Sequence, residues 1–274
     1  AGVPYDSEHI AYAKSTDTPV YMSAALVTQI VSKHVDGVTI IGVTGTRGKS
    51  TCTELIAHIL RTAGYRVHLG GNVRGVANLP LLEVIEEGDY LVLELDSWQL
   101  QGFGDLKLSP QIAVFTSFLD DHMNYYHNDK ERYFADKAQI YRHQGEYDVL
   151  IASAQARDEI SKRDPKKDVL VGERRKFDTR LIGEHNQVLA SLAYEVAAQC
   201  AVEEVVILSS IASFAPVEGR LEDCGMYNND TVRVINDNNA TTGDAVIAAI
   251  KAVQDAYGRK PILILGGADK GLPL

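Results

Sequence analysis

Residues 42–51 read GVTGTRGKST. The ending Gly-Lys-Ser belongs to the phosphate-binding loop pattern G-x-x-x-x-G-K-[ST], in which backbone N–H groups, a helix N-terminus and a lysine all face phosphate. That pattern places its first glycine five positions before Gly48, where this chain has Val43, and glycines stand instead at 42 and 45. The stretch is either a nucleotide loop of an unusual kind or a glycine-rich turn that ends in Lys-Ser.

The residues around the stretch favour the nucleotide loop. An apolar, β-branched run at 38–44 leads into it, and a helical pattern at 51–63 leads out. This is the strand, loop and helix order that the phosphate-binding mechanism requires. We expect Lys49 to reach the β and γ phosphates of a nucleotide and Ser50 to hold Mg²⁺.

The same alternation of strands and helices continues along the chain. Further apolar runs predict strands at 90–95, 112–117 and 147–153, and amphipathic patterns predict helices at 130–143 and 186–200. Continuous apolar strands separated by such helices indicate a parallel sheet that is covered on both faces. The expected class is α/β, with a doubly wound, mostly parallel sheet.

Three segments are expected along the chain. Residues 1–36 are too short for a domain and suggest the remnant of an N-terminal domain with its linker, residues 37–215 form the central domain, and residues 216–274 form a partial C-terminal domain. The last is expected to be a Rossmann-like β-α-β unit, with strands at 231–237 and 261–267 around a helix at 241–257. Both ends of the sequence look cut.

Composition excludes several classes of protein. The formal net charge of -10 and the pI near 5.3 argue against a nucleic-acid-binding face, which needs clustered Lys and Arg. No apolar run approaches the roughly 20 residues of a membrane helix. Three widely spaced cysteines suit a reducing compartment without disulfides, so the expected location is the cytoplasm. Of these cysteines, Cys52 is expected to be buried in the helix after the loop.

Two further loops carry polar groups at the carboxyl ends of predicted strands, where ligands bind in open α/β sheets. The motif LELDSWQL places Glu94 and Asp96 in one, and FLDDHMNYY places Asp120, Asp121 and His122 in the other. A carboxylate there can take Mg²⁺ directly or through water. Taken alone, each motif also fits an ordinary turn, and a lone histidine is more often a packing residue.

Taken together and in this order, the motifs resemble those of the Mur ligase family, the ATP-dependent amide-forming enzymes of peptidoglycan precursor synthesis. The opening stretch resembles the family's T-G-T-x-G-K-S-T loop, which has the same shifted glycines, and this answers the opening question in favour of a nucleotide site. The other matching motifs are LGGNV, ELDSWQL, DDHM, GEHN and INDNNAT. The resemblance covers nearly the whole chain and is strongest with the D-glutamate-adding members.

The resemblance implies a role for each matching residue. ATP would be bound by Gly45, Thr46, Gly48, Lys49, Ser50, Thr51, Asn186, Arg220 and Asp237. The metal ligands would be Ser50, Glu94, His122 and Lys137, the last as a carbamate. The substrate side would hold Asn72, Ser97, Gln99 and Lys270. The catalytic set would be Lys49, Glu94, His122, Lys137 and Lys270. Without the resemblance, Lys137 has the pattern of a solvated helix lysine.

The implied activity is an ATP-dependent ligation that adds D-glutamate to UDP-N-acetylmuramoyl-L-alanine through an acyl phosphate. Its implied cofactors are ATP and Mg²⁺, two ions in the family pattern, and its partners are the UDP-sugar peptide precursor and an amino acid, with no nucleic acid and no membrane. The nucleophile comes from the substrate, so no Ser-His-Asp arrangement is needed. We expect this chain to bind Mg-ATP without completing the ligation alone.

Four departures from the family motifs concern the substrate pocket more than the phosphate loop. Asp96 stands where the family has serine, Arg74 precedes the glycine of GGNVRG, Asn239 replaces a lysine, and Leu189 replaces a second asparagine. Two alternatives stay open. One is another amino-acid ligase of the superfamily, such as a folate polyglutamate or cyanophycin-type enzyme, and the other is a nucleotide-binding module that has lost ligation.

Overall fold

The computed structural model describes residues 7–172 and 175–266. Two compact units separate within these residues. The first holds residues 7–49 and 64–172, and the second holds residues 50–63 and 175–266. The predicted domain boundaries at 36 and 215 differ from this division and stay a prediction.

The first unit is built on a six-stranded sheet in the order β2-β3-β1-β4-β5-β6. Its strands are β1 (Thr39–Thr44), β2 (Val67–Gly71), β3 (Tyr90–Glu94), β4 (Ile112–Phe115), β5 (Val149–Ala152) and β6 (Leu170–Val171). All five strand pairs are parallel, which confirms the predicted fold class. Because β1 lies between β3 and β4, the chain reverses its winding at β1, and the carboxyl end of β1 is the point where such sheets bind ligands.

The helices of the first unit are α1 (Glu8–Ser15), α2 (Ser23–His34), a 3-10 helix η1 (Leu79–Glu83), α4 (Ser97–Leu106), α5 (Lys130–Arg142) and α6 (Ala154–Arg163). Of these, α2 packs against α4 and η1, and α4 packs against α5. The close approach of α2 to α4 depends on Gly102, where a Cβ would lie 2.5 Å from that of Met22.

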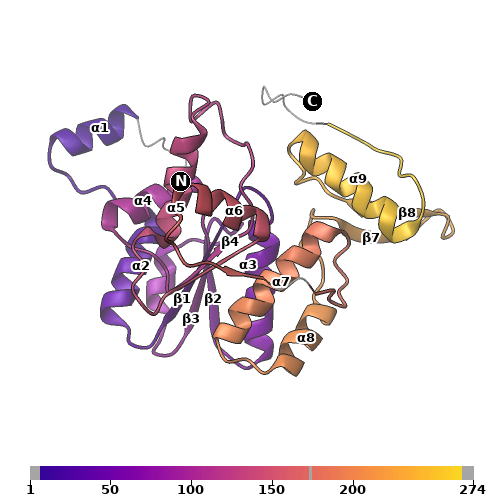
Figure 1. Cartoon of the computed structure of the whole chain (residues 1–274), viewed down its shortest axis with the longest axis horizontal. Helices are drawn as coiled ribbons and strands as arrows, with labels where there is room; N and C mark the ends of the chain where they lie inside the picture. Colours follow the sequence, from indigo (N-terminus) through magenta and orange to yellow (C-terminus); the bar gives the residue numbers. More distant parts are fainter. Residues whose placement is uncertain (1–6, 173–174, 267–274) are drawn as a thin grey trace. The chain divides into compact units, whose positions relative to one another are not determined.

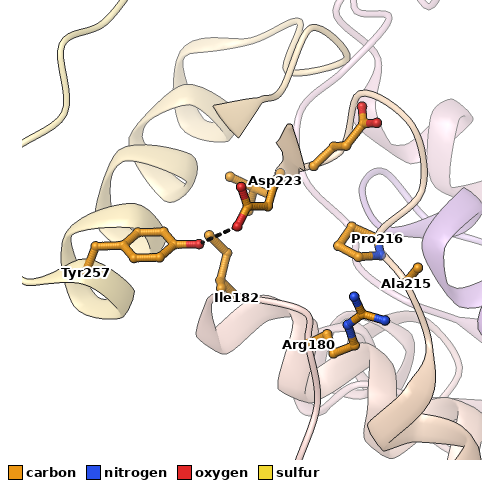
Figure 2. Close-up of a pocket in the computed structure, with 8 residues that line it drawn as sticks. Arg180, Ile182, Ala215, Pro216, Asp223 and Tyr257 are labelled. Carbon is orange, nitrogen blue, oxygen red and sulfur yellow. Dashed lines mark hydrogen bonds between the residues drawn. The ribbon is translucent and has the colours of Figure 1, made fainter. Parts of the chain in front are cut away.

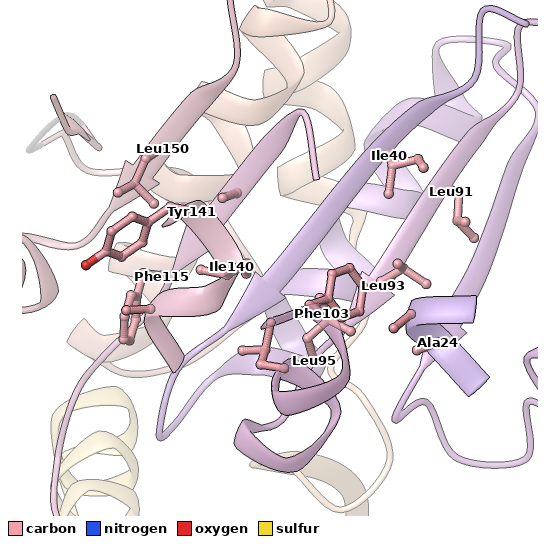
Figure 3. Packing of buried hydrophobic residues seen from close by; sticks show 14 of the residues in the cluster. Ala24, Ile40, Leu91, Leu93, Leu95, Phe103, Phe115, Ile140, Tyr141 and Leu150 are labelled. Carbon is pink, nitrogen blue, oxygen red and sulfur yellow. The ribbon is translucent and has the colours of Figure 1, made fainter. Parts of the chain in front are cut away.

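The core of the first unit lies between one face of the sheet and helices α2, α4 and α5 (Figure 3). Leu91 and Leu93 of β3 contribute alternate side chains to it, and Phe103 contributes from α4. The intervening strand residues, such as Val92 and Val114, are also buried. Burial of both faces explains why these strands are continuous apolar runs rather than alternating ones.

The second unit contains most of α3 (Lys49–Thr62), with α7 (Glu184–Gln199), α8 (Glu204–Ser213), β7 (Glu222–Tyr227), β8 (Val232–Asn236) and α9 (Gly243–Tyr257). Helix α3 contacts the end of α8, since the His58 ring lies 5.4 Å from that of Phe214. Helices α7 and α8 also pack against each other (Figure 1).

In the expected β-α-β unit near the C-terminus, the first strand and the helix are confirmed as β8 and α9, whereas the second strand is not found in residues 261–266. The strand β8 pairs antiparallel with β7 in a hairpin that the sequence pattern does not predict. Residues 261–266 form no strand among the described residues, and Ile262 and Ile264 are 95% and 93% exposed. A strand needs a neighbour to satisfy its backbone groups, and an apolar sequence without one does not form a ladder.

None of the described helices has both the length and the apolar character needed to cross a membrane. All three cysteines are free, and Cys52 is fully buried. Burial raises the pKa of the Cys52 thiol to about 12, so the position of Cys52 near the start of α3 does not activate it.

Candidate functional site

The loop 42–51 lies at the carboxyl end of β1, and two of its glycines adopt conformations that other residues rarely reach. Gly45 has φ +145° and Gly48 has φ +82°. A Cβ at Gly45 would lie 2.0 Å from the Thr116 hydroxyl oxygen, which follows β4. The shifted glycine of the motif is therefore required by the close approach of two loops.

Hydrogen bonds attach this loop to the segment after β4. The Thr46 N–H donates to the Ser117 carbonyl at 2.7 Å, and the Arg47 N–H donates to the Ser117 hydroxyl at 2.9 Å. In the other direction, the Thr116 hydroxyl donates to the Arg47 carbonyl at 2.5 Å, and the Leu119 N–H donates to the Thr46 hydroxyl at 2.9 Å. The conformation of the loop is thus set by contacts with residues about 70 positions away.

Two lysine amines meet at one carbonyl of the loop. Lys49 Nζ donates to Gly45 O at 3.0 Å, and Lys137 Nζ, from α5, donates to the same oxygen at 2.8 Å. The Lys137 side chain is 2% exposed. Burial, followed by the charge of Lys49, lowers the pKa of the Lys137 amine well below its ordinary value of 10.5.

Charged groups of both signs surround this pair of amines. Besides Lys49, the groups that act electrostatically on Lys137 are the carboxylates of Asp96 and Asp121 and the guanidinium of Arg47. Asp121 is itself buried, which alone would raise its pKa, but the neighbouring His122 and Arg47 charges lower it. The cations Lys49 and Arg47, on a glycine loop at a strand end, form a site suited to a polyanion.

The carboxyl ends of β2 and β3 bring three further predicted residues together. Glu94 is 5% exposed, and its carbonyl accepts the Asn72 N–H at 2.7 Å. The Gln99 amide has two alternatives: its oxygen accepts the Asp96 N–H at 3.3 Å, or, turned over, it accepts the Asn72 N–H at 3.3 Å and donates to Glu94 O at 3.1 Å. Gly71, with φ +81°, permits this approach, because a Cβ there would lie 2.0 Å from Glu94 O.

The departure at Asp96 has a local structural role. Asp96 is the N-cap of α4, and its carboxylate accepts the Gln99 N–H at 2.8 Å. Serine and aspartate both serve this purpose, so the cap survives the replacement. The next residue, Ser97, is only 1% exposed, and its predicted contact with substrate stays a prediction.

His122 has a left-handed backbone, with φ +55°, in the loop after β4. Its ring lies 4.7 Å from that of Trp98 and 6.4 Å from that of Tyr133. Of the neighbouring acids, Asp120 pairs at 2.7 Å with Lys130 on the surface. Sequence reasoning singled out His122 but missed Trp98 and Tyr133, whose aromatic rings have no motif of their own.

The predicted metal ligands of the first unit come from separate segments, since Glu94 ends β3, His122 lies in the loop after β4 and Lys137 lies on α5. Among residues 7–172 and 175–266, no group of three or more His, Cys, Asp or Glu side chains is placed to hold a metal ion. A site built from Glu94, His122 and a modified Lys137 would therefore depend on other oxygen ligands. That fits Mg²⁺, which usually takes one or two carboxylates together with waters and substrate phosphates.

In the second unit, Arg220 reaches the start of α3. Its Nη2 donates to the Ser50 hydroxyl at 3.0 Å. The next residue, Leu221, donates its N–H to the Asp237 carboxylate at 3.0 Å. Burial raises the pKa of Asp237, although the Arg220 and His185 charges oppose it. Arg220 thus connects Ser50 to the segment that holds Asp237 within this unit. Thr51, also predicted to bind the nucleotide, is buried at the start of α3.

A pocket of about 380 Å³ opens beside these residues (Figure 2). On one side of it, the Tyr257 hydroxyl contacts the Asp223 carboxylate at 3.4 Å. Its lining includes Ile182, whose carbonyl accepts the Asn186 amide at 2.8 Å, and Leu221. Asn186 and Asp237 are therefore hydrogen-bonded to residues that line the pocket, but they do not line it themselves.

Two of the departures from the family motifs, Asn239 and Leu189, lie in the second unit. The Asn239 amide donates to Gly219 O at 3.0 Å, so this departure from the family lysine serves a turn. Leu189 is 5% exposed on α7. Lys270 lies outside the described residues.

Comparison with known proteins gives consistent matches. The sequence profile described as the Mur ligase middle domain matches residues 43–187. The UDP-N-acetylmuramoylalanine--D-glutamate ligase of Nitratidesulfovibrio vulgaris (strain DP4) is 31% identical over 265 residues, which are 95% of this chain and 58% of that protein. The protein of the same name from Gloeobacter violaceus is 36% identical over 249 residues, which are 83% of this chain and 54% of that one.

Solved structures support the fold. MurF from Acinetobacter baumannii aligns with a TM-score of 0.67 at 18% identity, covering 84% of this chain and 57% of that one. MurF ligase from Thermotoga maritima in complex with ADP aligns with a TM-score of 0.65 at 19% identity, and the match covers 84% of this chain and 60% of that one. The chain spans less than two thirds of the length of these proteins. Since the profile covers more than half of its residues, the chain belongs to the Mur ligase family.

Proposed function

We propose that this chain is the nucleotide-binding part of an ATP-dependent ligase that adds D-glutamate to UDP-N-acetylmuramoyl-L-alanine in the cytoplasm. The observation that carries the proposal is the arrangement at Gly45, where the amines of Lys49 and Lys137 meet on a glycine loop beside Arg47. The relatives named for this activity supply the choice of substrates.

The proposed reaction has two steps. A carboxylate oxygen of the precursor attacks the γ-phosphorus of ATP, the bond to the β-phosphate oxygen breaks, and an acyl phosphate and ADP form. The amine of D-glutamate then attacks the acyl carbon, loses a proton, and expels phosphate. Phosphoryl transfer depends mostly on positioning and charge neutralisation. Lys49 and the loop N–H groups of Gly45 and Gly48 are suited to that work.

Glu94, His122 and Ser50 are the residues that would hold Mg²⁺, whose contribution is to neutralise charge on the phosphates. Lys137 is proposed to join them as a carbamate. A neutral amine is the reactive form: its nitrogen lone pair attacks the carbon of CO₂, and one N–H proton leaves. Burial, which lowers the pKa of Lys137, favours that neutral form. The product is an anion placed beside Lys49 and Arg47.

The other residues complete the proposal. In the second unit, Asn186 would contact the adenine, and Arg220, Asp237 and Thr51 the ribose and phosphates. Asn72, Ser97, Gln99 and Lys270 would act on the substrate side. Asn239 bonds within a turn and does not supply the positive charge that the family's lysine would have at this position. The affinity for the amino acid should therefore be measured first after nucleotide binding.

Calorimetric titration of Mg-ATP into the chain and its Lys49→Ala variant tests the nucleotide site. Removing a charged donor from the phosphates is expected to weaken binding at least about tenfold. Lys162→Ala is the matched control, because Lys162 is an exposed lysine of α6 paired with Glu159 at 2.7 Å. Equal affinity in the wild type and the Lys49→Ala variant would refute the proposed role of the loop.

The choice of amino acid is tested separately. Phosphate release from ATP is measured in the longest protein that contains this chain, with UDP-N-acetylmuramoyl-L-alanine and a panel of amino acids. Release that requires D-glutamate supports the proposal. Release with a different amino acid indicates another ligase of the superfamily, and retained Mg-ATP binding without any amino-acid-dependent release indicates a nucleotide-binding module.

A further inference from the structure

The side chain of Arg47 pairs with the loop after β4. Arg47 Nη1 lies 3.0 Å from Asp121 Oδ2, and the two side chains are 26% and 12% exposed. The other oxygen of the same carboxylate, Oδ1, accepts the His122 N–H at 2.9 Å. Asp121 Oδ2 also lies 3.7 Å from His122 Nε2. These three residues are called the Arg47 clasp below.

The clasp acts on a residue whose backbone needs support. His122 has φ +55°, a conformation that costs a residue with a Cβ free energy unless its surroundings impose it. The Asp121 carboxylate secures its N–H, and the N–H groups of Tyr125 and Tyr126 secure its carbonyl at 3.0 and 3.1 Å. With both backbone groups held, the ring lies against Trp98 at 4.7 Å.

We infer that Arg47 is a positioning residue: through Asp121 it fixes the backbone and the ring of His122, and so connects the phosphate loop to the proposed metal ligand. The inference rests on the proposed function only in taking His122 as that ligand. An acid that bonds to both the guanidinium and the His122 N–H transmits the position of one loop to the other, because neither bond survives a large shift of either loop.

The direct alternative is that Arg47 contacts phosphate itself. In that case its removal weakens nucleotide binding at every Mg²⁺ concentration and leaves His122 where it is. In the positioning role, removal disturbs His122 in the absence of any nucleotide, and it raises the Mg²⁺ concentration needed for binding. The two roles therefore differ in a measurement that uses no ligand at all.

The chain offers a local reporter, since Trp98 is its only tryptophan and its ring contacts that of His122. We would measure the emission of Trp98 and its quenching by acrylamide in the wild type, in Arg47→Met and in Lys130→Met, after far-UV circular dichroism shows equal helix content. Lys130→Met is the matched control, because it removes a cation that pairs at 2.7 Å with Asp120, the neighbour of Asp121. Methionine keeps the length of both side chains.

In Arg47→Met, the ring of His122 is expected to leave Trp98, so that the quenching constant rises and the emission shifts to longer wavelength. Lys130→Met is expected to match the wild type. The single variant Asp121→Asn and the double variant Asp121→Asn with Arg47→Met are expected to change the Trp98 signal by the same amount, because both residues act on His122 through the same contacts. Arg47→Lys, which keeps the charge, should recover part of the wild-type signal, and it serves as the test variant if Arg47→Met does not fold.

A second measurement uses Mg²⁺ dependence. Removing a residue that orients a metal ligand typically weakens metal affinity about tenfold or more, so the Mg²⁺ concentration for half-maximal ATP binding should rise by that factor in Arg47→Met. Unchanged Trp98 quenching in Arg47→Met, or the same change in Lys130→Met, would overturn the inference. If the wild type fails to bind Mg-ATP, the proposed function fails, while the fluorescence comparison still decides the role of Arg47.

Discussion

Lys137 is a buried amine, and its burial makes the stability of the protein depend on pH. Its pKa in the folded chain lies well below 10.5, mainly because of burial and next because of Lys49, while Asp96 and Asp121 act in the opposite direction. Between the folded and unfolded pKa values, the unfolded chain binds more protons at this position. The free energy of unfolding should therefore rise with pH through that window, and this contribution should be lost as pH falls.

Lys137→Met removes the titrating group while filling the same space. We expect urea unfolding at pH 7, 8 and 9 to show a smaller rise of the unfolding free energy with pH in Lys137→Met than in the wild type. A pKa that differs by one unit between the unfolded and the folded chain corresponds to about 1.4 kcal/mol, so the difference in slope should be well resolved. Lys162→Met, which changes an exposed lysine, should keep the wild-type slope; identical slopes in all three proteins would contradict this account of Lys137.

At the scale of single residues, the sequence predicts what a local motif carries. Lys49 and Ser50 follow from their loop, and Glu94 follows from the end of a strand. The burial of Lys137 and the pairing of Arg47 with Asp121 do not, because the partners lie 92 and 74 positions away. Position in a motif fixes which groups are present, whereas burial and pKa depend on contacts that only the folded chain forms.

The turn that joins β1 to α3 should tolerate no side chain at Gly45. An alanine there would need φ near +145° and would bring its Cβ to 2.0 Å from Thr116 Oγ1. We expect Gly45→Ala to cost about 3 kcal/mol or more, from backbone strain and overpacking together. Gly64, with φ +90° and open space around it, is the control for strain alone, so Gly64→Ala should cost only about 1 kcal/mol. Chemical denaturation compares the two, and equal costs would show that the contact with Thr116 relaxes freely.

Helix α4 gives a second prediction at the scale of elements. Asp96 caps its first turn, so Asp96→Ala should lower the unfolding free energy by about 1 kcal/mol. Asp96→Ser, which restores the residue of the family motif, should be close to neutral, because serine can accept the same N–H. A loss in Asp96→Ser as large as that in Asp96→Ala would mean that the charge of Asp96, rather than its cap, stabilises this region.

Elements with buried apolar runs are predictable from the sequence, and elements without them are not. The strands β1, β3, β4 and β5 and helices α3, α5, α7 and α9 lie close to their expected ranges. The hairpin strand β7 reads EDCGMY and is largely exposed, so it has no hydrophobic pattern to detect. Conversely, residues 261–266 are apolar yet form no strand among the described residues. Hydrophobicity predicts a strand only where the fold supplies a partner.

At the scale of the whole molecule, we expect this chain to bind the nucleotide without catalysing the ligation. The match covers 58% of the length of the Nitratidesulfovibrio relative, so the rest of that protein lies beyond the matched part. The phosphate loop and its lysines lie within the described part of this chain and need no other segment for their mutual contacts. We therefore expect the 274-residue polypeptide to bind Mg-ATP.

The same polypeptide is not expected to release phosphate in an amino-acid-dependent manner. Ligation requires the acyl phosphate, the amine and the phosphate-binding groups to be held together with water excluded, and enzymes usually achieve this by closure of further segments or domains. The measurement is phosphate release from ATP with UDP-N-acetylmuramoyl-L-alanine and D-glutamate, beside calorimetry of Mg-ATP on the same sample. Turnover comparable to that of a full-length relative assayed in parallel would show that these 274 residues hold every group the reaction needs.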